Sequence, residues 1–312
     1  MGHMSDDFPV SVEADLFFAR RDTGELRLDL YRPTSPDERV PVVLWLHGGG
    51  WFAGDRTLAP DLAERARSSG CAVASVEYRL SGQALFPAQL HDVRAAIRFL
   101  RTHADVYRLD PRGVGAWGSS AGGHLAALAG LTGHLDVLPG EEETEGDPSL
   151  QAVAESYGPV DLAAEAQTAL PGAGGAHTPE ARLLGGPPAQ RPEAARQASP
   201  LSWVVPEAPP FQISHGTGDT LVSHHQSERL HDALVAAGAS SELYLVEGYR
   251  HGFLNPAGRL DVDLARVMDD GRLRSEGPAP AEHRAQQGPG ERTTFGFEDI
   301  DAFFRRHLAA RP

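Results

Sequence analysis

The chain has 312 residues, a length that suits one large α/β domain or two small ones. Its formal net charge of −15 argues against binding to nucleic acid or to an anionic membrane. All 28 basic residues are Arg, which excludes a Schiff-base lysine and a phosphate-loop lysine, and the single cysteine, Cys71, excludes an internal disulfide and a cysteine metal cluster.

Targeting signals are absent from the sequence as it stands. No apolar run approaches the roughly 18 residues that a membrane span requires. Residues 1–9 lack the charged-then-apolar order of a signal peptide, which favours a cytoplasmic protein. A chain whose leader had been removed would look the same, so secretion stays open.

Hydrophobic periodicity predicts strands and helices that alternate along the chain. Strands are expected over residues 10–18, 26–31, 40–46, 72–76, 113–117, 152–157, 211–215 and 242–246. Helices are expected over residues 58–67, 87–100, 121–131, 224–237 and 297–308. This alternation predicts an α/β fold with a doubly wound, mostly parallel, eight-stranded sheet and helices on both faces, in one domain over residues 1–312.

Three segments fall outside the alternating pattern. Residues 159–200 are rich in Ala, Gly and Pro, which is typical of short helices and loops in a cap-like insertion. Residues 139–148 are expected to form an acidic surface loop, and residues 255–294 a long irregular segment with no assigned role.

The motif Gly118-Ser-Ser-Ala-Gly-Gly123 directly follows an apolar strand and directly precedes an Ala/Leu helix. Gly-x-Ser-x-Gly alone is common by chance, but the strand–turn–helix context is that of a nucleophile elbow. The structural alternative to a catalytic role is an ordinary Ser-Gly turn in which the serine caps the helix. We expect Ser120 to be the nucleophile.

A second glycine motif, His47-Gly-Gly-Gly-Trp51, ends the buried strand over residues 40–46. Three glycines let backbone N–H groups approach a substrate carbonyl, where they stabilise an oxyanion. The expected donors are the N–H groups of Gly49, Gly50 and Ala121. A phosphate-binding turn is the alternative, although it would normally include a lysine.

A serine nucleophile needs a base and a group that orients the base. His251 follows the last predicted strand and Asp219 follows the strand before it, which places Ser120, Asp219 and His251 in the chain order expected for such a triad. His215 is expected to be structural, and His224 and His225 to face solvent or the rim of the cleft without metal-site spacing. Asp161 and Glu247 remain alternative acids.

Four motifs carry a resemblance to known esterases: His47–Trp51, Gly118–Gly123, Asp219–Val222 and His251–Phe253. They resemble the hormone-sensitive-lipase-like esterases of the α/β-hydrolase fold and, more closely, bacterial carboxylesterases and feruloyl or acetyl-xylan esterases. The first group usually has Asp at the position of Ser119 and often Phe at the position of Trp51. These departures favour the second group, which includes kynurenine formamidases.

The resemblance implies a serine carboxylesterase that hydrolyses short-chain acyl or aryl esters through an acyl-enzyme. Trp51, Ser119 and Tyr157 are the expected pocket residues. We expect a small-molecule ester as substrate, no nucleic-acid or membrane partner, no cofactor and no metal, with a homodimer left open. One alternative is an arylformamidase. A non-catalytic binding protein is the less favoured alternative, because such proteins usually lack a triad residue and all three are present here.

Overall fold

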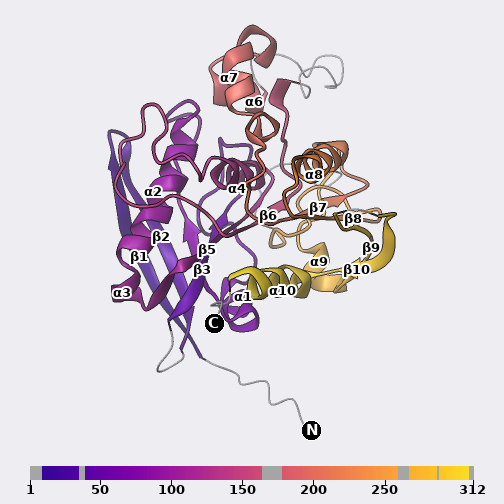
Figure 1. Cartoon of the computed structure of the whole chain (residues 1–312), viewed down its shortest axis with the longest axis horizontal. Helices are drawn as coiled ribbons and strands as arrows, with labels where there is room; N and C mark the ends of the chain where they lie inside the picture. The colour runs from indigo at the N-terminus through magenta and orange to yellow at the C-terminus, as the bar shows by residue number, and fades with distance from the viewer. Residues whose placement is uncertain (1–8, 35–38, 164–177, 259–266, 287, 309–312) are drawn as a thin grey trace.

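The computed structural model describes residues 9–34, 39–163, 178–258, 267–286 and 288–308 (Figure 1). Within these residues, ten strands form one sheet in the order β1-β2-β4-β3-β5-β6-β7-β8-β9-β10. The strands are β1 (Val10–Arg21), β2 (Gly24–Pro33), β3 (Val40–Leu46), β4 (Ala72–Val76), β5 (Leu109–Ser119), β6 (Ala152–Ser156), β7 (Phe211–Gly216), β8 (Ser241–Val246), β9 (Ala279–Arg284) and β10 (Glu291–Phe295).

The centre of the sheet is parallel and its two edges are antiparallel. Strands β4, β3, β5, β6, β7 and β8 pair in parallel. Strands β1 and β2 form one antiparallel edge, and β9 and β10 form the other. The loops that follow β3, β5, β7 and β8 therefore leave the same edge of the sheet, where an open α/β sheet places its site.

The predicted doubly wound, mostly parallel sheet is confirmed, but the expected count of eight strands is wrong. The two additional strands are β9, inside residues 255–294, and β10, which begins there and ends at Phe295; this range was expected to be irregular. Strand β10 is exposed at four of its five residues, so it lacks a strong apolar alternation. Strand β9 bonds to β8 and β10 bonds to β9, and Ala279, Ala281 and Phe295 are the residues of this extension that join the core.

Strand β3 shows why the central strands read as continuous apolar runs. Val42, Leu44 and Leu46 belong to one hydrophobic core, whereas Val43 and Trp45 belong to a second. Successive side chains of a strand point to opposite faces of the sheet, so the sheet is buried on both faces.

Helices cover both faces of the sheet, with α2, α4 and α8 on one side and α1 and α10 on the other (Figure 1). The helices are α1 (Leu62–Ser69), α2 (Ala88–Thr102), α3 (Ala104–Tyr107), α4 (Ala121–Leu131), α6 (Pro179–Leu184), α7 (Pro192–Gln197), α8 (His225–Ala237), α9 (Arg272–Glu276) and α10 (Phe297–Leu308). Helix α1 starts later than predicted because Asp61 caps it, accepting from the N–H of Glu64 at 3.0 Å. Among the described residues, none of the helices combines the length and the apolar composition that a membrane crossing requires.

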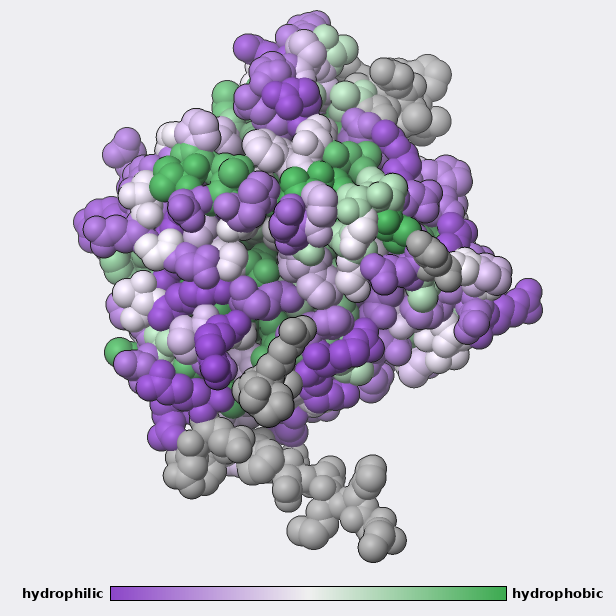
Figure 2. Space-filling view, in the orientation of Figure 1, coloured by the Kyte–Doolittle hydropathy of each residue, from purple (hydrophilic) through white to green (hydrophobic). Residues whose placement is uncertain are grey.

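The expected cap-like insertion is described only in part, because residues 164–177 lie outside the described residues. Its remaining part forms α6, α7 and two short 3-10 turns, and α6 and α7 project beyond α4 at one end of the molecule (Figure 1). In Figure 2, hydrophobic residues gather on the surface below these helices, while hydrophilic residues cover most of the rest of this face. The role of the insertion as a cap stays a prediction.

The acidic segment over residues 139–148 lies mostly at the surface, as expected, but two of its glutamates form ion pairs with arginines of the domain. The side chain of Glu141 is fully buried, and its carboxylate binds the guanidinium groups of Arg94 and Arg98 on α2. Glu143 binds Arg21 on β1. A buried charge requires opposite charges around it, so this segment fastens α2 and β1 rather than only facing solvent.

Candidate active site

The turn between β5 and α4 holds Ser120 in a strained conformation. Its φ of 55° and ψ of −121° are uncommon for a residue with a side chain and cost about 1–3 kcal/mol. The backbone on either side is tied down: Ser120 N–H donates to Ser156 O at 2.8 Å, and Ser120 O accepts from the N–H of His124. This is the geometry of the predicted nucleophile elbow.

Gly122 lets helix α4 pack directly on the end of β3. A Cβ atom added to Gly122 would lie 1.9 Å from the carbonyl oxygen of Leu46, far inside any allowed contact. Close packing of these two backbones brings the glycine loop that follows β3 against the elbow. A Cβ on Gly48 in that loop would lie 3.3 Å from the Cβ of Ser120.

The structure joins Ser120, His251 and Asp219 in one chain of hydrogen bonds. Nε2 of His251 lies 2.8 Å from Oγ of Ser120, and Nδ1 of His251 lies 2.6 Å from Oδ2 of Asp219. The other carboxylate oxygen, Oδ1, accepts from the N–H groups of Leu221 and Val222. Because a carboxylate only accepts, Nδ1 of His251 carries the proton and Nε2 is free to accept the hydroxyl proton of Ser120.

Asp219 is held in its charged form. Burial alone would raise the pKa of Asp219, but the neighbouring His251 and His215 outweigh burial and hold that pKa well below its usual value. The carboxylate therefore stays ionised at neutral pH and can stabilise a positive charge on His251.

Three N–H groups are available beside Ser120. Among the described residues, no loop hydrogen bond engages the N–H of Gly49 or Gly50. The N–H of Ala121 opens helix α4 and has no acceptor within that helix. Free N–H groups at these positions are compatible with binding an oxygen that carries developing negative charge, and their role as an oxyanion site stays a prediction.

Tyr78 and His47 anchor this glycine loop. Their rings stack with centroids 4.4 Å apart, and the Tyr78 hydroxyl donates to the carbonyl oxygen of His47 at 2.7 Å. Complete burial lowers the pKa of His47 to about 4, so the ring is neutral at physiological pH. We find no reason for His47 to act as a base; it holds the loop.

The structure buries the three expected pocket residues, none of which is more than 2% exposed. Trp51 donates from Nε1 to Nδ1 of His124, and the ring of Tyr157 lies edge-on to His251 with centroids 4.9 Å apart. Their place in the substrate pocket stays a prediction that this burial does not support. Phe52 is the aromatic residue of the glycine loop that remains exposed, with the guanidinium of Arg182 above its ring.

The rival catalytic residues lie elsewhere. Asp161 binds Arg229 on α8, and Glu247 is exposed at the end of β8. His215 is completely buried, and neither of its ring nitrogens contacts Ser120: Nδ1 lies against Ser227, and Nε2 lies against Asp219 and Val222 O.

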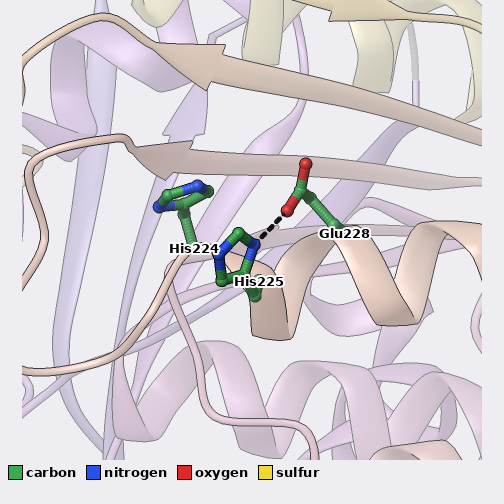
Figure 3. Close-up of side chains that lie close together, drawn as sticks. All are labelled: His224, His225 and Glu228. Atoms are coloured by element: carbon green, nitrogen blue, oxygen red, sulfur yellow. Dashed lines mark hydrogen bonds and ion pairs between the residues drawn. The ribbon is translucent and has the colours of Figure 1, made fainter.

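One side-chain cluster among the described residues has the composition of a metal site: His224, His225 and Glu228 at the start of α8 (Figure 3). Two features oppose a cation there. Glu228 already binds His225 and Arg284, and the positive end of the helix dipole lies at this helix start. The triad chemistry described above needs no metal ion.

Two groups of residues that the sequence did not predict support the triad. Glu155, Ser227 and His215 form a buried chain that ends on Asp219. Asp269, from the segment expected to be irregular, accepts from the N–H of Arg250 at 2.7 Å and donates its own N–H to the carbonyl oxygen of His251 at 2.8 Å. The only sequence signal was the position of His215 four residues before Asp219.

Comparison with known proteins gives consistent matches. The chain is 32% identical to Esterase LipC of Mycobacterium tuberculosis over 72% of this chain and 56% of that protein, and 35% identical to Esterase LipQ of the same organism over 70% and 51%. It therefore spans little more than half the length of these curated relatives.

Solved structures of esterases match over most of their length. A truncated form of carbohydrate esterase from gut microbiota has a TM-score of 0.70 and 30% identity, covering 78% of this chain and 90% of that one. A thermophilic esterase, Est2 from Thermogutta terrifontis, has a TM-score of 0.64 and 25% identity, covering 88% and 92%. The family model BD-FAE matches residues 28–234, a range that includes Ser120 and Asp219 and ends before His251, and the chain belongs to this family of the α/β-hydrolase fold.

Proposed function

We propose that the chain is a serine carboxylesterase that hydrolyses short-chain acyl or aryl esters through an acyl-enzyme on Ser120. The observation that carries the proposal is the continuous hydrogen-bonded chain from Ser120 through His251 to Asp219. The esterase names of the matched relatives support the same reaction class.

In the first half of the reaction, Nε2 of His251 takes the proton from Ser120 as its oxygen attacks the ester carbonyl. Asp219 keeps the proton of His251 on Nδ1 and stabilises the imidazolium that forms. His251 then gives its proton to the departing alcohol, and the acyl group remains on Ser120.

The glycine loop and the start of α4 stabilise the tetrahedral intermediates. In this mechanism the N–H groups of Gly49, Gly50 and Ala121 donate to the oxygen that becomes negative, and each such donor contributes about 3–4 kcal/mol in measured cases. In the second half, His251 takes a proton from the water that attacks the acyl-enzyme, and then gives this proton to Oγ of Ser120 as the bond to the acyl group breaks and the acid leaves.

The preference for short acyl groups rests on the close packing around the elbow and on the neighbouring structures. Trp51 packs against His124 on α4, and Tyr157 packs against His251. The Thermogutta terrifontis esterase has been solved with propionate and with butyrate bound. Both ligands are short carboxylates, the product class that this proposal requires.

The nucleophile is tested by Ser120→Ala, assayed with p-nitrophenyl acetate. We expect kcat to fall by about 10⁴-fold or more, because the variant keeps the oxyanion donors but loses the attacking oxygen. Ser69→Ala, which changes another buried serine on α1, is the matched control and should keep wild-type activity. Retained activity in Ser120→Ala would place the nucleophile elsewhere.

The substrate class is tested by comparing p-nitrophenyl acetate, butyrate and palmitate with N-formylkynurenine. We expect the highest kcat/KM for acetate or butyrate. Faster turnover of palmitate would contradict the short-chain proposal, and faster turnover of N-formylkynurenine would favour the arylformamidase alternative.

A further inference from the structure

Behind the carboxylate of Asp219, three buried polar side chains continue the line of the triad. Nε2 of His215 lies 3.2 Å from Oδ2 of Asp219, the same oxygen that accepts the hydrogen bond from Nδ1 of His251. Nδ1 of His215 lies 2.7 Å from Oγ of Ser227. Oγ of Ser227 in turn lies 3.4 Å from Oε2 of Glu155.

These side chains come from three different elements and none of them is exposed. Glu155 lies on β6, His215 on β7 and Ser227 on the first turn of α8, and each is 0% exposed. Among the described residues, Glu155 has no ion pair, and its Oε1 accepts from the N–H of Gly158. A buried carboxyl group without a cation beside it either is protonated or destabilises the fold by the cost of burying its charge.

The positions of the protons follow from the partners. Nε2 of His215 faces two acceptors, Oδ2 of Asp219 and the carbonyl oxygen of Val222, so it carries a proton. Ser227 has a single hydroxyl proton to share between His215 and Glu155. One further proton must therefore lie on either Glu155 or Nδ1 of His215.

The two placements differ in their effect on the triad. A proton on Nδ1 would make His215 a cation that competes with His251 for the negative charge of Asp219. A proton on Glu155 keeps His215 neutral: Glu155 donates to Ser227, Ser227 donates to Nδ1, and His215 donates from Nε2 to Asp219. Only the second placement leaves the full charge of Asp219 to the imidazolium of His251.

We propose that Glu155, Ser227 and His215 are positioning residues for the esterase reaction, in which Glu155 acts as a neutral carboxylic acid that keeps His215 uncharged and holds Asp219 in place. The proposal rests on the proposed function, since it concerns the same triad. It adds a set of residues beyond the triad and assigns each a protonation state.

The electrostatic surroundings agree with this placement. Burial raises the pKa of Glu155 to about 8, although the hydrogen bonds that the ionised carboxylate would accept from Gly158 and Ser227 lower this pKa in part. Glu155 is thus mostly protonated at neutral pH and loses its proton as the pH rises through about 8. The titratable groups that face this chain from the elements around it are Tyr157 after β6, Asp219 after β7, His224 at the start of α8 and His251 after β8.

The decisive comparison is between Glu155→Gln and Glu155→Met. A glutamine amide can donate to Ser227 and accept from Gly158 at every pH, as the protonated acid does, whereas methionine has a similar volume and can do neither. We expect kcat of Glu155→Gln to stay within about threefold of wild type and kcat of Glu155→Met to fall by about 10–100-fold at unchanged KM, the range seen for partners that orient catalytic groups.

The pH profile separates this role from a merely structural one. Wild-type kcat/KM should fall as the pH rises through about 8, and this alkaline loss should be absent in Glu155→Gln. Difference infrared spectra of wild type minus Glu155→Gln, recorded at about pH 6.5 and about pH 9.5, should show the C=O band of a protonated carboxyl only at the lower pH. The infrared readout does not depend on activity.

His231, on the same helix α8 as Ser227, provides a matched control for substitution of His215. His231 on α8 is buried, and its Nδ1 lies 2.9 Å from Oγ of Ser241, so it forms a His–Ser pair like that of His215 and Ser227 but away from the triad. We expect His215→Leu to lower kcat by about 10–100-fold and His231→Leu to leave kcat unchanged, even if both lower thermal stability.

Each outcome decides the question. Equal losses in Glu155→Gln and Glu155→Met would show that Glu155 works as an ion and would overturn the proposal, as would wild-type kcat in both. If wild type itself hydrolysed no ester, the proposed function would fail, while the infrared band would still report on the protonation of Glu155.

Discussion

The two halves of the candidate site are built in different ways. On the nucleophile side, the loops after β3 and β5 are short contiguous motifs whose shape comes from backbone packing, as the contact of Gly122 with Leu46 shows. On the acid–base side, the loops after β7 and β8 carry Asp219 and His251. These two residues are held by side chains from β6, from α8 and from the segment around Asp269.

This difference shows two ways of making a site rigid. Backbone packing is fixed by volume, so it is insensitive to pH and intolerant of an added atom. A buried chain of polar side chains tolerates changes of shape better, but it depends on every proton being in place. Mutations on the nucleophile side should therefore lower stability through steric overlap, whereas mutations on the acid–base side should lower activity through lost hydrogen bonds and charge.

The largest expected effect lies on the acid–base side. Asp219→Asn removes the charge that stabilises the imidazolium and places an amide against the Nδ1 proton, so we expect kcat to fall by about 10⁴-fold with little change in fold. Asp161→Asn, which alters the rival acid bound to Arg229, is the control and should keep activity within about twofold. A large loss in Asp161→Asn and none in Asp219→Asn would reverse the assignment of the acid.

On the nucleophile side the sharpest change is Gly122→Ala. Its new Cβ would lie 1.9 Å from the carbonyl oxygen of Leu46, so we expect the free energy of unfolding to fall by about 3 kcal/mol or more. Gly238→Ala provides the comparison, because Gly238 ends α8 at a φ of 86° with nothing within 4 Å of an added Cβ. It should cost only about 1 kcal/mol. The measurement is chemical denaturation. If both variants lost the same free energy of unfolding, the close approach of Gly122 to Leu46 would not be the cause of the loss.

The smallest effect is expected at Asp269, which ties the loop of His251 at both Arg250 N–H and His251 O. Asp269→Ala keeps the backbone bond to His251 O but removes the carboxylate that accepts from Arg250, so we expect kcat to fall by about tenfold at unchanged KM as the loop of His251 loosens. Asp110 is the matched control, because it also accepts from both the backbone N–H and the guanidinium of one arginine, Arg112, and it lies at the end of β5 away from Ser120. Asp110→Ala should leave kcat unchanged; a shared loss would mean that both act only through stability.

The sequence predicted the parallel core of the sheet and the chemistry of its loops. Apolar runs such as residues 40–46 identify doubly buried strands, and Gly118–Gly123 and His47–Trp51 identify loops whose function requires short contiguous segments. It missed β10 because four of its five residues are exposed, and it missed β9 because Ala-Pro-Ala-Glu-His-Arg contains no β-branched or aromatic residue. It also missed the burial of Glu141, because acidic runs in a sequence carry no sign of the arginines that neutralise them.

By itself, the sequence determined which residues could form a nucleophile elbow, an oxyanion loop and an ordered acid and base, because these depend on local spacing after strands. Only the tertiary structure decided that Glu155, Ser227 and His215 meet behind Asp219, and that Asp269 holds the loop of His251. Those contacts join residues up to 72 positions apart. Burial then gives them their protonation and hydrogen-bonding roles, and burial is a property of the folded chain rather than of any local pattern.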